Sequence, residues 1–586
     1  MKTIRKMMLG AAASALVLTS VTAPVALAQS AANQTALVDY VNPLMGTDSS
    51  YRLSYGNTYP AVAVPFGMNS WTPVTGEPGS GWGYTYDGEK ISGIKQTHQP
   101  SPWMNDYAAF ALMAETGPVK VKQQERGSWF SHKAEVARPY SYKVYLADYD
   151  VTAEVAPTER AAQFRFTFPE SDDAHILLDG LAGGSMVKVD VKNRRITGYV
   201  RNNNGGVPDN FHNYFVAEFD RDFTLARTWA GDNAPTNELA REGDHVGAVL
   251  SFKTKKGDKV HVRVASSFIS PEQALLNLRS EIGSDSFDTT QAKAKAAWEK
   301  ELSRIRVTDP DPEKIRTFYS SLYRMLQFPR VFYEKDANGK IVHYSPYDGK
   351  VHDGYMFTDN GFWDTWRAVF PFFALMYPDL DSQIMQGLVN TYKEGGWLPE
   401  WASPGYRNVM IGSNSANLIA DAYLNGVRGF DVETLYEAMI KNATTSEGRP
   451  KDKAGKVIAA VGREGAEHYN QLGYVPYDVG INENAARTLE YATADFSIAQ
   501  LAKALGKDAD AKKYRARALN YQKLYDNQSG WIRGRNKDGS WATPFNPYKW
   551  GDAFTEGNAL HYSWAVMQDV QGLMTLMGGR EKFVER

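Results

Sequence analysis

Glu556 lies in the stretch of this sequence that best suits acid–base chemistry. It follows Trp550-Gly-Asp552-Ala-Phe-Thr and precedes Gly557-Asn-Ala-Leu-His561-Tyr. A carboxyl group among Gly and aromatic residues is typical of the proton donor of a glycoside hydrolase. Such chemistry needs a second carboxylate on the other side of the sugar. Glu556 alone is therefore not sufficient for this chemistry, and a second carboxylate is required.

Three other stretches combine polar and aromatic residues. The first contains Trp363, Asp364 and Arg367, which could clamp a sugar by hydroxyl hydrogen bonds and ring stacking. Its alternative interpretation is a helix start, with Asp favoured by the helix dipole and the aromatic rings in the core. Both interpretations stay open from these residues alone.

The second stretch is Gly395-Gly-Trp397-Leu-Pro-Glu400-Trp, a break rich in Gly, Pro and Trp. Trp397 and Glu400 are candidate substrate contacts, although a purely structural role is equally compatible. The third stretch, Thr97 to Asp106, is stiffened by Pro and contains His98 and Trp103. A lone His is usually structural, whereas Trp103 on a loop could complete the pocket of a neighbouring domain.

Composition excludes several function classes. Lys+Arg number 65 and Asp+Glu 67, so the net charge of −2 does not support nucleic-acid binding. The chain has no Cys, which excludes disulfides and thiolate metal sites. No Gly-rich phosphate loop, His-Glu-x-x-His or Gly-x-Ser-x-Gly motif occurs, so nucleotide, zinc-protease and α/β-hydrolase chemistry are not indicated.

The first 28 residues have the pattern of a signal peptide. Lys2, Arg5 and Lys6 precede an apolar run, and Ala26-Leu27-Ala28 fits a cleavage site. We therefore expect an exported protein, periplasmic or extracellular. No later run of about 18 apolar residues predicts a membrane span.

The pattern of the chain predicts a multidomain protein with β structure first and helices second. Phe164, Phe166 and Phe168 alternate with polar residues, as do the valines of 260–264, which predicts a β-sandwich over 36–270. Ser270-Pro271 is a helix-start signal, and 271–330 is predicted as a helical linker. Residues 331–586 are predicted as a helical domain, in which two helices joined near Gly506 form an αα-hairpin. Tyr514, Ala518, Tyr521 and Tyr525 are expected on the second of these helices.

Together these residues resemble glycoside hydrolase family 92, the calcium-dependent exo-α-mannosidases. The resemblance runs from about Val38 to Arg586. The matching stretches are Val41–Thr47, Asn57–Pro60 with Val64–Gly67, Thr97–Asp106, Val151–Glu154 with Thr158–Arg160, Trp363–Thr365 with Arg367, Ile419–Tyr423, Thr488–Tyr491, Thr555–Asn558, and Asp569–Leu573 with Met577–Gly579.

The resemblance implies an N-terminal β-sandwich, a helical linker and a C-terminal (α/α)6 barrel. It places Glu556 at the family's general acid, Asp364 at a carboxylate that holds the terminal mannose, and Trp103 at a Trp of members that prefer α-1,2 linkages. It implies Ca²⁺ as cofactor, inversion of configuration, and mannose-containing oligosaccharides or glycoproteins, N-glycans among them, as partners.

The sequence also departs from the family pattern. Family members continue past the last residue of this chain, with an Asn-Glu-Pro-Ser-His-His-like stretch for calcium and the leaving sugar, and an Asn-Asp-Asp-like stretch for the general base. Neither stretch is present, and His561 stands where many members have Gln. We therefore expect the barrel to be incomplete at its C-terminus, the general base and most metal ligands to be absent, and the chain alone to be inactive.

Two alternatives remain from the sequence. One is a non-catalytic mannoside-binding protein that keeps Asp364 and the aromatic loops. The other is a different (α/α)6 carbohydrate-active enzyme, such as a phosphorylase, for which no phosphate site is found in the sequence.

Overall fold

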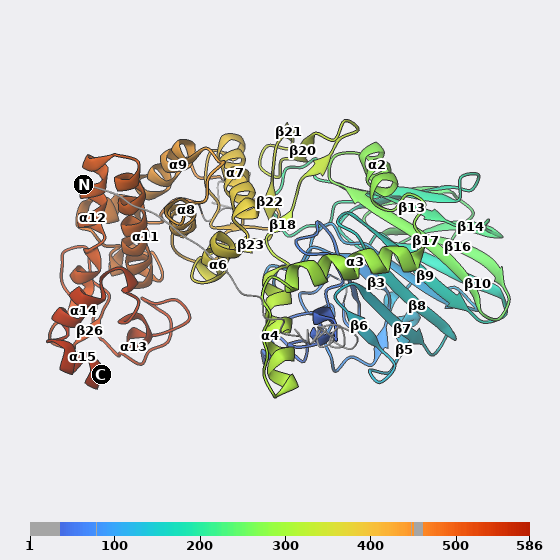
Figure 1. The fold of residues 1–586 in the computed structure, drawn as a ribbon, viewed down its shortest axis with the longest axis horizontal. Coiled ribbons are helices and arrows are strands. Elements are labelled where there is room, and N and C mark those ends of the chain that lie inside the picture. The colour runs from blue at the N-terminus through green and yellow to red at the C-terminus, as the bar shows by residue number, and fades with distance from the viewer. Residues whose placement is uncertain (1–34, 78, 447, 451–460) are drawn as a thin grey trace, which may run out of the picture.

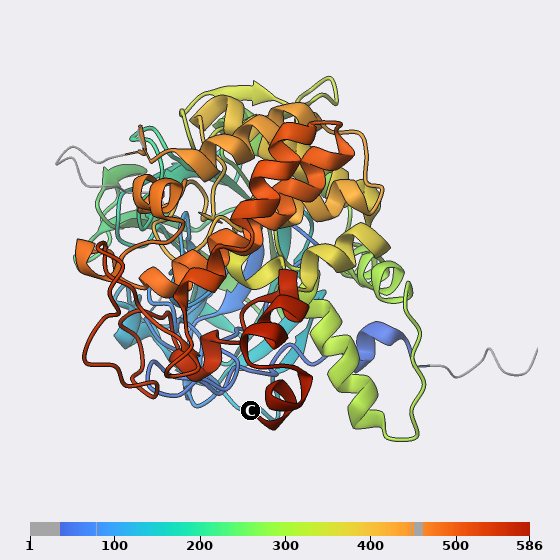
Figure 2. The same ribbon diagram turned by 90° about the vertical axis from the view of Figure 1, so that its left-hand side faces the viewer.

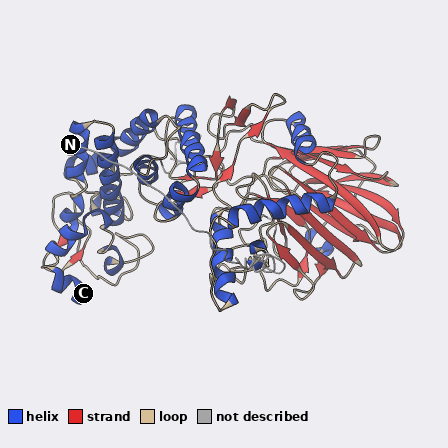
Figure 3. Ribbon diagram, in the orientation of Figure 1, coloured by secondary structure: helices blue, strands red, loops and turns tan. Residues whose placement is uncertain are grey.

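The protein consists of a β-rich half followed by a helical half. The computed structural model describes residues 35–77, 79–446, 448–450 and 461–586, so the predicted signal peptide (1–28) lies outside the described residues. Figures 1 and 3 show strands gathered at one end of the long axis and helices at the other. The predicted order of β structure and then α structure is thus confirmed.

Two large antiparallel sheets form the core of the first half, and β2 (Lys90–Ile91) pairs with β5 (Ser128–Trp129) beside them. The six-stranded sheet contains, in spatial order, β1 (Ser70–Pro73), β3 (Ile94–Thr97), β4 (Ala111–Thr116), β10 (Ser171–Asp179), β16 (Val246–Thr254) and β14 (Leu225–Ala230). The nine-stranded sheet contains β15 (Ala240–Gly243), β11 (Ser185–Asp190), β12 (Arg195–Val200), β13 (Asn213–Phe219), β17 (Asp258–Ser267), β9 (Ala161–Phe168), β8 (Val151–Pro157), β7 (Ser141–Leu146) and β6 (Val136–Arg138).

The alternating residues of β9 and β17 explain how the sheets pack. In their antiparallel register Phe164 lies opposite Val262 and Phe166 opposite Val260, and all four side chains are buried. Trp71 of the six-stranded sheet meets Phe164 edge to face, with the ring centroids 5.0 Å apart. The apolar face that the sequence predicts therefore packs between the two sheets as a single core.

Three helices join the halves: α2 (Pro271–Glu281), α3 (Phe287–Leu302) and α4 (Pro312–Met325). Ser270 caps α2, because its side chain accepts a hydrogen bond from the backbone N–H of Gln273, and Pro271 begins the helix. Trp298 of α3 is buried and donates its indole N–H to the carbonyl of Ala63 at 2.6 Å. Figure 1 shows α3 and α4 at the boundary between the halves.

The second half begins with short strands rather than with helices. These are β18 (Arg330–Val331), β19 (Glu334–Lys335), β20 (Ile341–Tyr344), β21 (Val351–Asp353), β22 (Phe357–Thr358) and β23 (Asn360–Gly361), and β23 later pairs with β24 (Trp401–Ala402). The helices are α5 (Phe362–Thr365), α6 (Val369–Met376), α7 (Pro378–Gly395), α8 (Ser415–Leu424), α9 (Val432–Thr444), α10 (Ala466–Leu472), α11 (Asn484–Ala504), α12 (Asp508–Arg517), α13 (Ala559–Tyr562), α14 (Val570–Leu576) and α15 (Arg580–Glu585).

Helices α11 and α12 form the predicted hairpin, and Figure 2 shows them side by side at the end of the molecule. Gly506 has a φ of +72° in the connecting turn, a conformation that glycine adopts without strain. The predicted length of α12 is wrong. It ends at Arg517, and residues Asn520–Leu524 form a 3₁₀ turn. The apolar spacing had predicted burial correctly, but burial does not require that the α-helical hydrogen bonds continue.

Two carboxyl groups face the space between α7 and α8. Asp381 is only 1% exposed, and no described residue gives either of its oxygens a hydrogen bond. Burial and the negative charge of Asp421 raise the pKa of Asp381 to about 7. Burial also raises the pKa of Asp421, against the hydrogen bond that Asn425 donates to it.

We expect Asp381→Asn to stabilise the protein at high pH. Because the pKa of this carboxyl is higher in the folded than in the unfolded state, its contribution to folding stability is most favourable below pH ~4 and is lost as the pH rises through about 7. The amide cannot ionise, so the variant should gain about 1–3 kcal/mol at pH ~8 and little at pH ~4. Thermal unfolding midpoints at both pH values measure this, with Asp379→Asn on the exposed side of α7 as control. A gain that is equal at both pH values would contradict the explanation.

Candidate active site

A cavity of about 690 Å³ opens between the two halves, and three of the predicted site residues line it: Glu556, Asp364 and Trp103. Segments from both halves contribute to its wall. The other lining residues are Pro100, Ser101, Met104, Phe328, Asp359, Asn360, Gly361, Thr365, Trp401, Val409 and Met410. Residues that are more than 400 positions apart in the sequence thus meet around one space large enough for a sugar.

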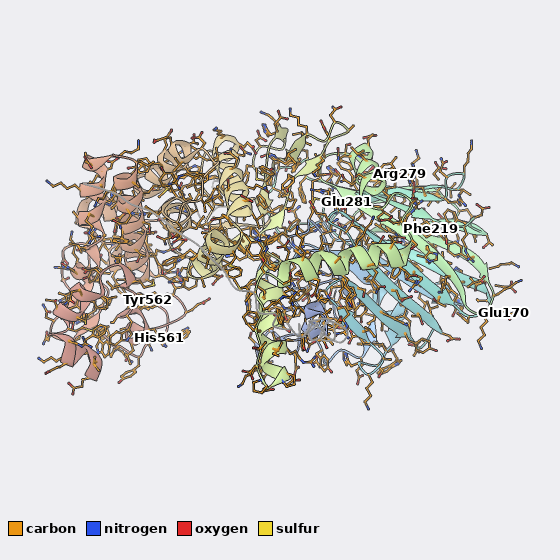
Figure 4. All side chains as sticks on the ribbon, in the orientation of Figure 1. Glu170, Phe219, Arg279, Glu281, His561 and Tyr562 are labelled. Carbon is orange, nitrogen blue, oxygen red and sulfur yellow. The ribbon has the colours of Figure 1, made fainter. Side chains whose placement is uncertain are left out.

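Glu556 reaches the cavity from a tight turn before α13. Its backbone has a φ of +48°, an uncommon conformation for a non-glycine residue, and its side chain is exposed. Asn558 caps α13 by accepting hydrogen bonds from the backbone N–H groups of Leu560 and His561, and the Tyr562 hydroxyl donates to the carbonyl of Thr555 at 2.7 Å. Figure 4 places His561 and Tyr562 in the helical half, at the opposite end from Glu170. The turn is therefore held on both sides of Glu556.

Asp364 lies on the short helix α5. Partial burial raises the pKa of its carboxyl group, and the positive charge of Arg367 opposes that rise. Trp363 and Arg367 do not line the cavity. Both donate hydrogen bonds to the same oxygen of the buried Glu490, at 3.0 Å and 3.1 Å. These two residues anchor α5 to α11, and Asp364 between them is left facing the cavity.

Trp103 lies on a loop of the β-rich half and is 58% exposed. The loop is anchored at Asp106, whose buried carboxylate accepts hydrogen bonds from Thr97 and from the backbone of His98. Lys95 forms a 2.8 Å ion pair with Asp106, and it lowers the pKa of that carboxyl against the effect of burial. The indole is therefore presented by a rigid loop.

The remaining predicted contacts, His98, Trp397 and Glu400, do not line the cavity. Both ring nitrogens of His98 are hydrogen-bonded, to Tyr107 and to Asn69, inside the core. Burial lowers the pKa of His98 to about 4. The position of His98 therefore does not support the expected substrate contact. It agrees with the alternative interpretation, in which this His has a structural role.

Trp397 and Glu400 are also buried within the helical half. The indole of Trp397 donates to the carbonyl of Gly448 at 3.1 Å. Glu400 accepts hydrogen bonds from the hydroxyl and the backbone N–H of Ser415, at 2.7 Å and 3.0 Å, at the start of α8. Burial raises the pKa of Glu400 to about 8. The expected sugar contact is not supported for either residue, because both side chains are buried and form hydrogen bonds within the protein.

Asp359 and Asn360 also line the cavity, although the sequence did not mark them as candidates. Asp359 has a φ of +62° and accepts hydrogen bonds from the hydroxyls of Tyr107 and Ser403, at 2.9 Å and 3.0 Å. Burial raises its pKa to about 7, and Arg330 opposes the rise. Because Tyr107 belongs to the β-rich half, Asp359 ties the two halves together. The Thr-Asp-Asn-Gly turn before α5 was the available signal.

Asn360 is the second missed residue. It is buried, its carbonyl oxygen accepts a hydrogen bond from Thr365 at 2.7 Å, and its amide nitrogen has no hydrogen-bond partner among the described residues. Gly361 follows it, and a Cβ at that position would collide with the indole of Trp401. In this wall the backbone of Gly361 lies directly against the indole of Trp401, and the side-chain amide of Asn360 can donate a hydrogen bond to a ligand.

A second, more polar hollow of about 640 Å³ adjoins this cavity, and Val409, Met410 and Glu556 line both. Its wall also contains Glu483 and Arg487, which form an ion pair at 3.1 Å. No three His, Asp or Glu side chains come together to hold a metal ion among the residues that the structure describes.

Comparison with known proteins agrees with this geometry. The profile of the glycosyl hydrolase family 92 N-terminal domain matches residues 40–267, and that of the catalytic domain of the same family matches residues 273–586. The chain belongs to glycosyl hydrolase family 92. It is therefore a glycoside hydrolase by family, and the resemblance stated from the sequence is confirmed.

Solved structures of family 92 are similar over nearly the whole chain. An inverting mannosidase from Bacteroides thetaiotaomicron VPI-5482 superposes with a TM-score of 0.90 at 46% identity, over 94% of this chain and 74% of that chain. An α-mannosidase from Bacteroides thetaiotaomicron, in complex with mannoimidazole, gives a TM-score of 0.84 at 33% identity, over 94% and 73%. A protein of Arthroderma benhamiae described as an uncharacterized secreted glycosidase is 26% identical, over 93% of this chain and 73% of its own length.

Proposed function

We propose that this protein is an exo-acting α-mannosidase that removes terminal mannose, with preference for α-1,2 linkages. The observation that carries the proposal is the meeting of Glu556, Asp364 and Trp103 around one sugar-sized cavity. The mannosidases among its structural relatives support the sugar assignment.

Each of the three residues has a role suited to its position. Glu556 is the general acid, which donates its proton to the departing glycosidic oxygen. Asp364, an exposed carboxylate of the cavity wall, accepts hydrogen bonds from hydroxyls of the terminal mannose. Trp103 packs against the leaving sugar and favours the α-1,2 linkage.

The reaction proposed is hydrolysis with inversion, as in the inverting mannosidase relative. Water attacks the anomeric carbon on the face opposite the leaving group, and a base accepts its proton. We assign the base to no described residue. Asp359 is the remaining carboxyl of the cavity wall, and hydrogen bonds from Tyr107 and Ser403 occupy its oxygens.

Ca²⁺ is proposed on the family resemblance alone. The described residues do not assemble a group of three metal-binding side chains, so the ion is given no role in a reaction step. When bound, a hard cation of this kind would hold sugar hydroxyl oxygens.

The proposed partners are mannose-containing oligosaccharides and glycoproteins, including N-glycans, and the proposed location is periplasmic or extracellular. The secreted glycosidase among the relatives supports export. Among the described helices, none has the length and apolar character that crossing a membrane requires.

The decisive experiment is an assay of the protein expressed from its complete reading frame on α-1,2-, α-1,3- and α-1,6-mannobiose. Proton NMR should detect β-mannose as the first product, with the α-1,2 substrate cleaved fastest. Addition of a chelator should abolish turnover, and Ca²⁺ should restore it. Initial release of α-mannose would contradict inversion. Measurable mannoside binding without hydrolysis would favour the non-catalytic alternative.

Glu490→Gln tests how Asp364 is positioned. The amide still accepts a hydrogen bond from Trp363 but loses the ion pair with Arg367, so α5 should be held less firmly. Since Asp364 contacts substrate and Glu490 does not, we expect KM to rise about tenfold while kcat changes less than about threefold. An unchanged KM in a correctly folded variant would show that Glu490 does not position Asp364.

A further inference from the structure

Three aromatic rings cluster on the surface beside the cavity. Tyr51, Trp82 and Trp103 meet edge to face, with ring centroids 5.1–5.6 Å apart in all three pairs. Tyr51 is 73% exposed and Trp103 is 58% exposed, whereas Trp82 is half-buried. Large rings grouped in contact with water are a feature of binding surfaces, because isolated folding would favour their burial.

The chain holds these rings together by close backbone contacts. Gln99 donates its amide to the carbonyl of Gly81 at 2.7 Å, and a Cβ at Gly81 would collide with Pro102, the residue before Trp103. The segments that carry Trp82 and Trp103 are therefore packed against each other without room for a side chain.

The segment that carries Tyr51 is fixed in a similar way. The Ser49 hydroxyl accepts hydrogen bonds from the backbone N–H groups of Tyr55 and Asn57, at 2.9 Å and 3.0 Å. The backbones of Gly46 and Gly56 come so close that a Cβ on Gly56 would overlap Gly46. The cluster is thus built from three segments that the fold ties in place.

We propose that Tyr51, Trp82 and Trp103 form a platform that binds the second and third sugars of a mannose-containing chain whose terminal residue occupies the cavity. The proposal rests on the proposed function. Trp103 lines the cavity with Glu556 and Asp364, and it also contacts the two other rings. A saccharide that leaves the cavity over Trp103 meets Tyr51 next. The apolar faces of sugars stack on such rings while their hydroxyls stay in water.

The platform predicts a preference for oligosaccharides over single sugars. The polar hollow that shares Glu556 with the cavity offers a competing path for the same chain. A chain that left by that path would not touch Tyr51, so removal of the Tyr51 ring distinguishes the two paths.

Calorimetry on the Glu556→Gln protein, which we expect to bind substrate but to cleave it only slowly, tests the platform. We compare methyl α-mannoside with an α-1,2-linked mannotriose. Tyr51→Ala should weaken mannotriose binding about fivefold to tenfold more than it weakens methyl mannoside binding. Tyr51→Phe keeps the ring and should retain most of the affinity. Tyr145→Ala, which removes a half-exposed ring on β7, is the matched control and should bind both ligands normally.

Three results would overturn the platform. Equal losses for both ligands would place Tyr51 in the terminal-sugar site, and no loss for either would direct the chain to the polar hollow. If the parent protein bound mannotriose no more tightly than methyl mannoside, there would be no binding site for the second sugar. If the parent protein bound neither ligand, the proposed function itself would fail, and circular dichroism of each variant excludes misfolding as the cause.

Discussion

Replacing Glu556 by Gln should lower kcat for α-1,2-mannobiose by about 10²–10⁴-fold while KM changes little. The amide has nearly the same shape but cannot donate a proton to the departing oxygen. The turn around Glu556 depends on the Asn558 cap and the Tyr562 hydroxyl, neither of which the substitution touches. Steady-state kinetics of the protein from its complete reading frame gives the measurement.

An activated substrate separates acid catalysis from a structural effect. A 2,4-dinitrophenyl α-mannoside has a leaving group that needs little protonation, so the variant should retain far more activity on it than on mannobiose. Glu437→Gln, on the exposed surface of α9, serves as control and should leave both rates unchanged. Near-normal cleavage of mannobiose by the Glu556 variant would remove this residue from the acid role.

The largest stability effect is expected from Asp495→Ala. Asp495 is fully buried on α11 and pairs with Arg463 at 2.7 Å and with Arg517 at 2.9 Å, while the Tyr469 hydroxyl donates to it at 3.0 Å. The substitution leaves the buried guanidinium of Arg463 without a counter-charge. Breaking such a pair costs about 3–5 kcal/mol, and the midpoint of thermal unfolding should fall accordingly.

An exposed ion pair provides the comparison for this loss. Asp353 pairs with Lys340 at 2.6 Å, but both side chains are more than half exposed. Asp353→Ala should therefore change the free energy of unfolding by less than about 1 kcal/mol. Similar losses of unfolding free energy for Asp353→Ala and Asp495→Ala would contradict this explanation. They would show that burial of the ion pairs of Asp495 with Arg463 and Arg517 does not add to the stability of the helical half.

The order of β structure and helices could be predicted from the sequence more fully than the cavity wall. Alternation in β9 and β17 and the Ser270-Pro271 cap depend on neighbouring residues, so they could be recognised without tertiary structure. The second hairpin helix was predicted too long, because the spacing of Tyr514 and Tyr521 reports burial and not the hydrogen bonds of the backbone.

Residue types alone could not separate binding side chains from buried ones. His98, Glu400 and Trp397 have the same chemistry as residues that contact sugars, yet each has its polar atoms satisfied inside the protein. The Thr-Asp-Asn-Gly stretch is only a weak sequence signal for Asp359, and the hydrogen bond of Asp359 with Tyr107 joins residues 252 positions apart.

By itself, the sequence determined the β-then-α order, the family and the three candidates Glu556, Asp364 and Trp103, because local periodicity and short motifs carry that information. Only the tertiary structure decided that these three share one cavity, that Trp363 and Arg367 hold α5 through Glu490, and that Tyr51 and Trp82 extend the surface of Trp103. The physical reason is that the burial of a side chain, its pKa and the residues it contacts all depend on packing between distant segments. Composition and local spacing do not encode that packing.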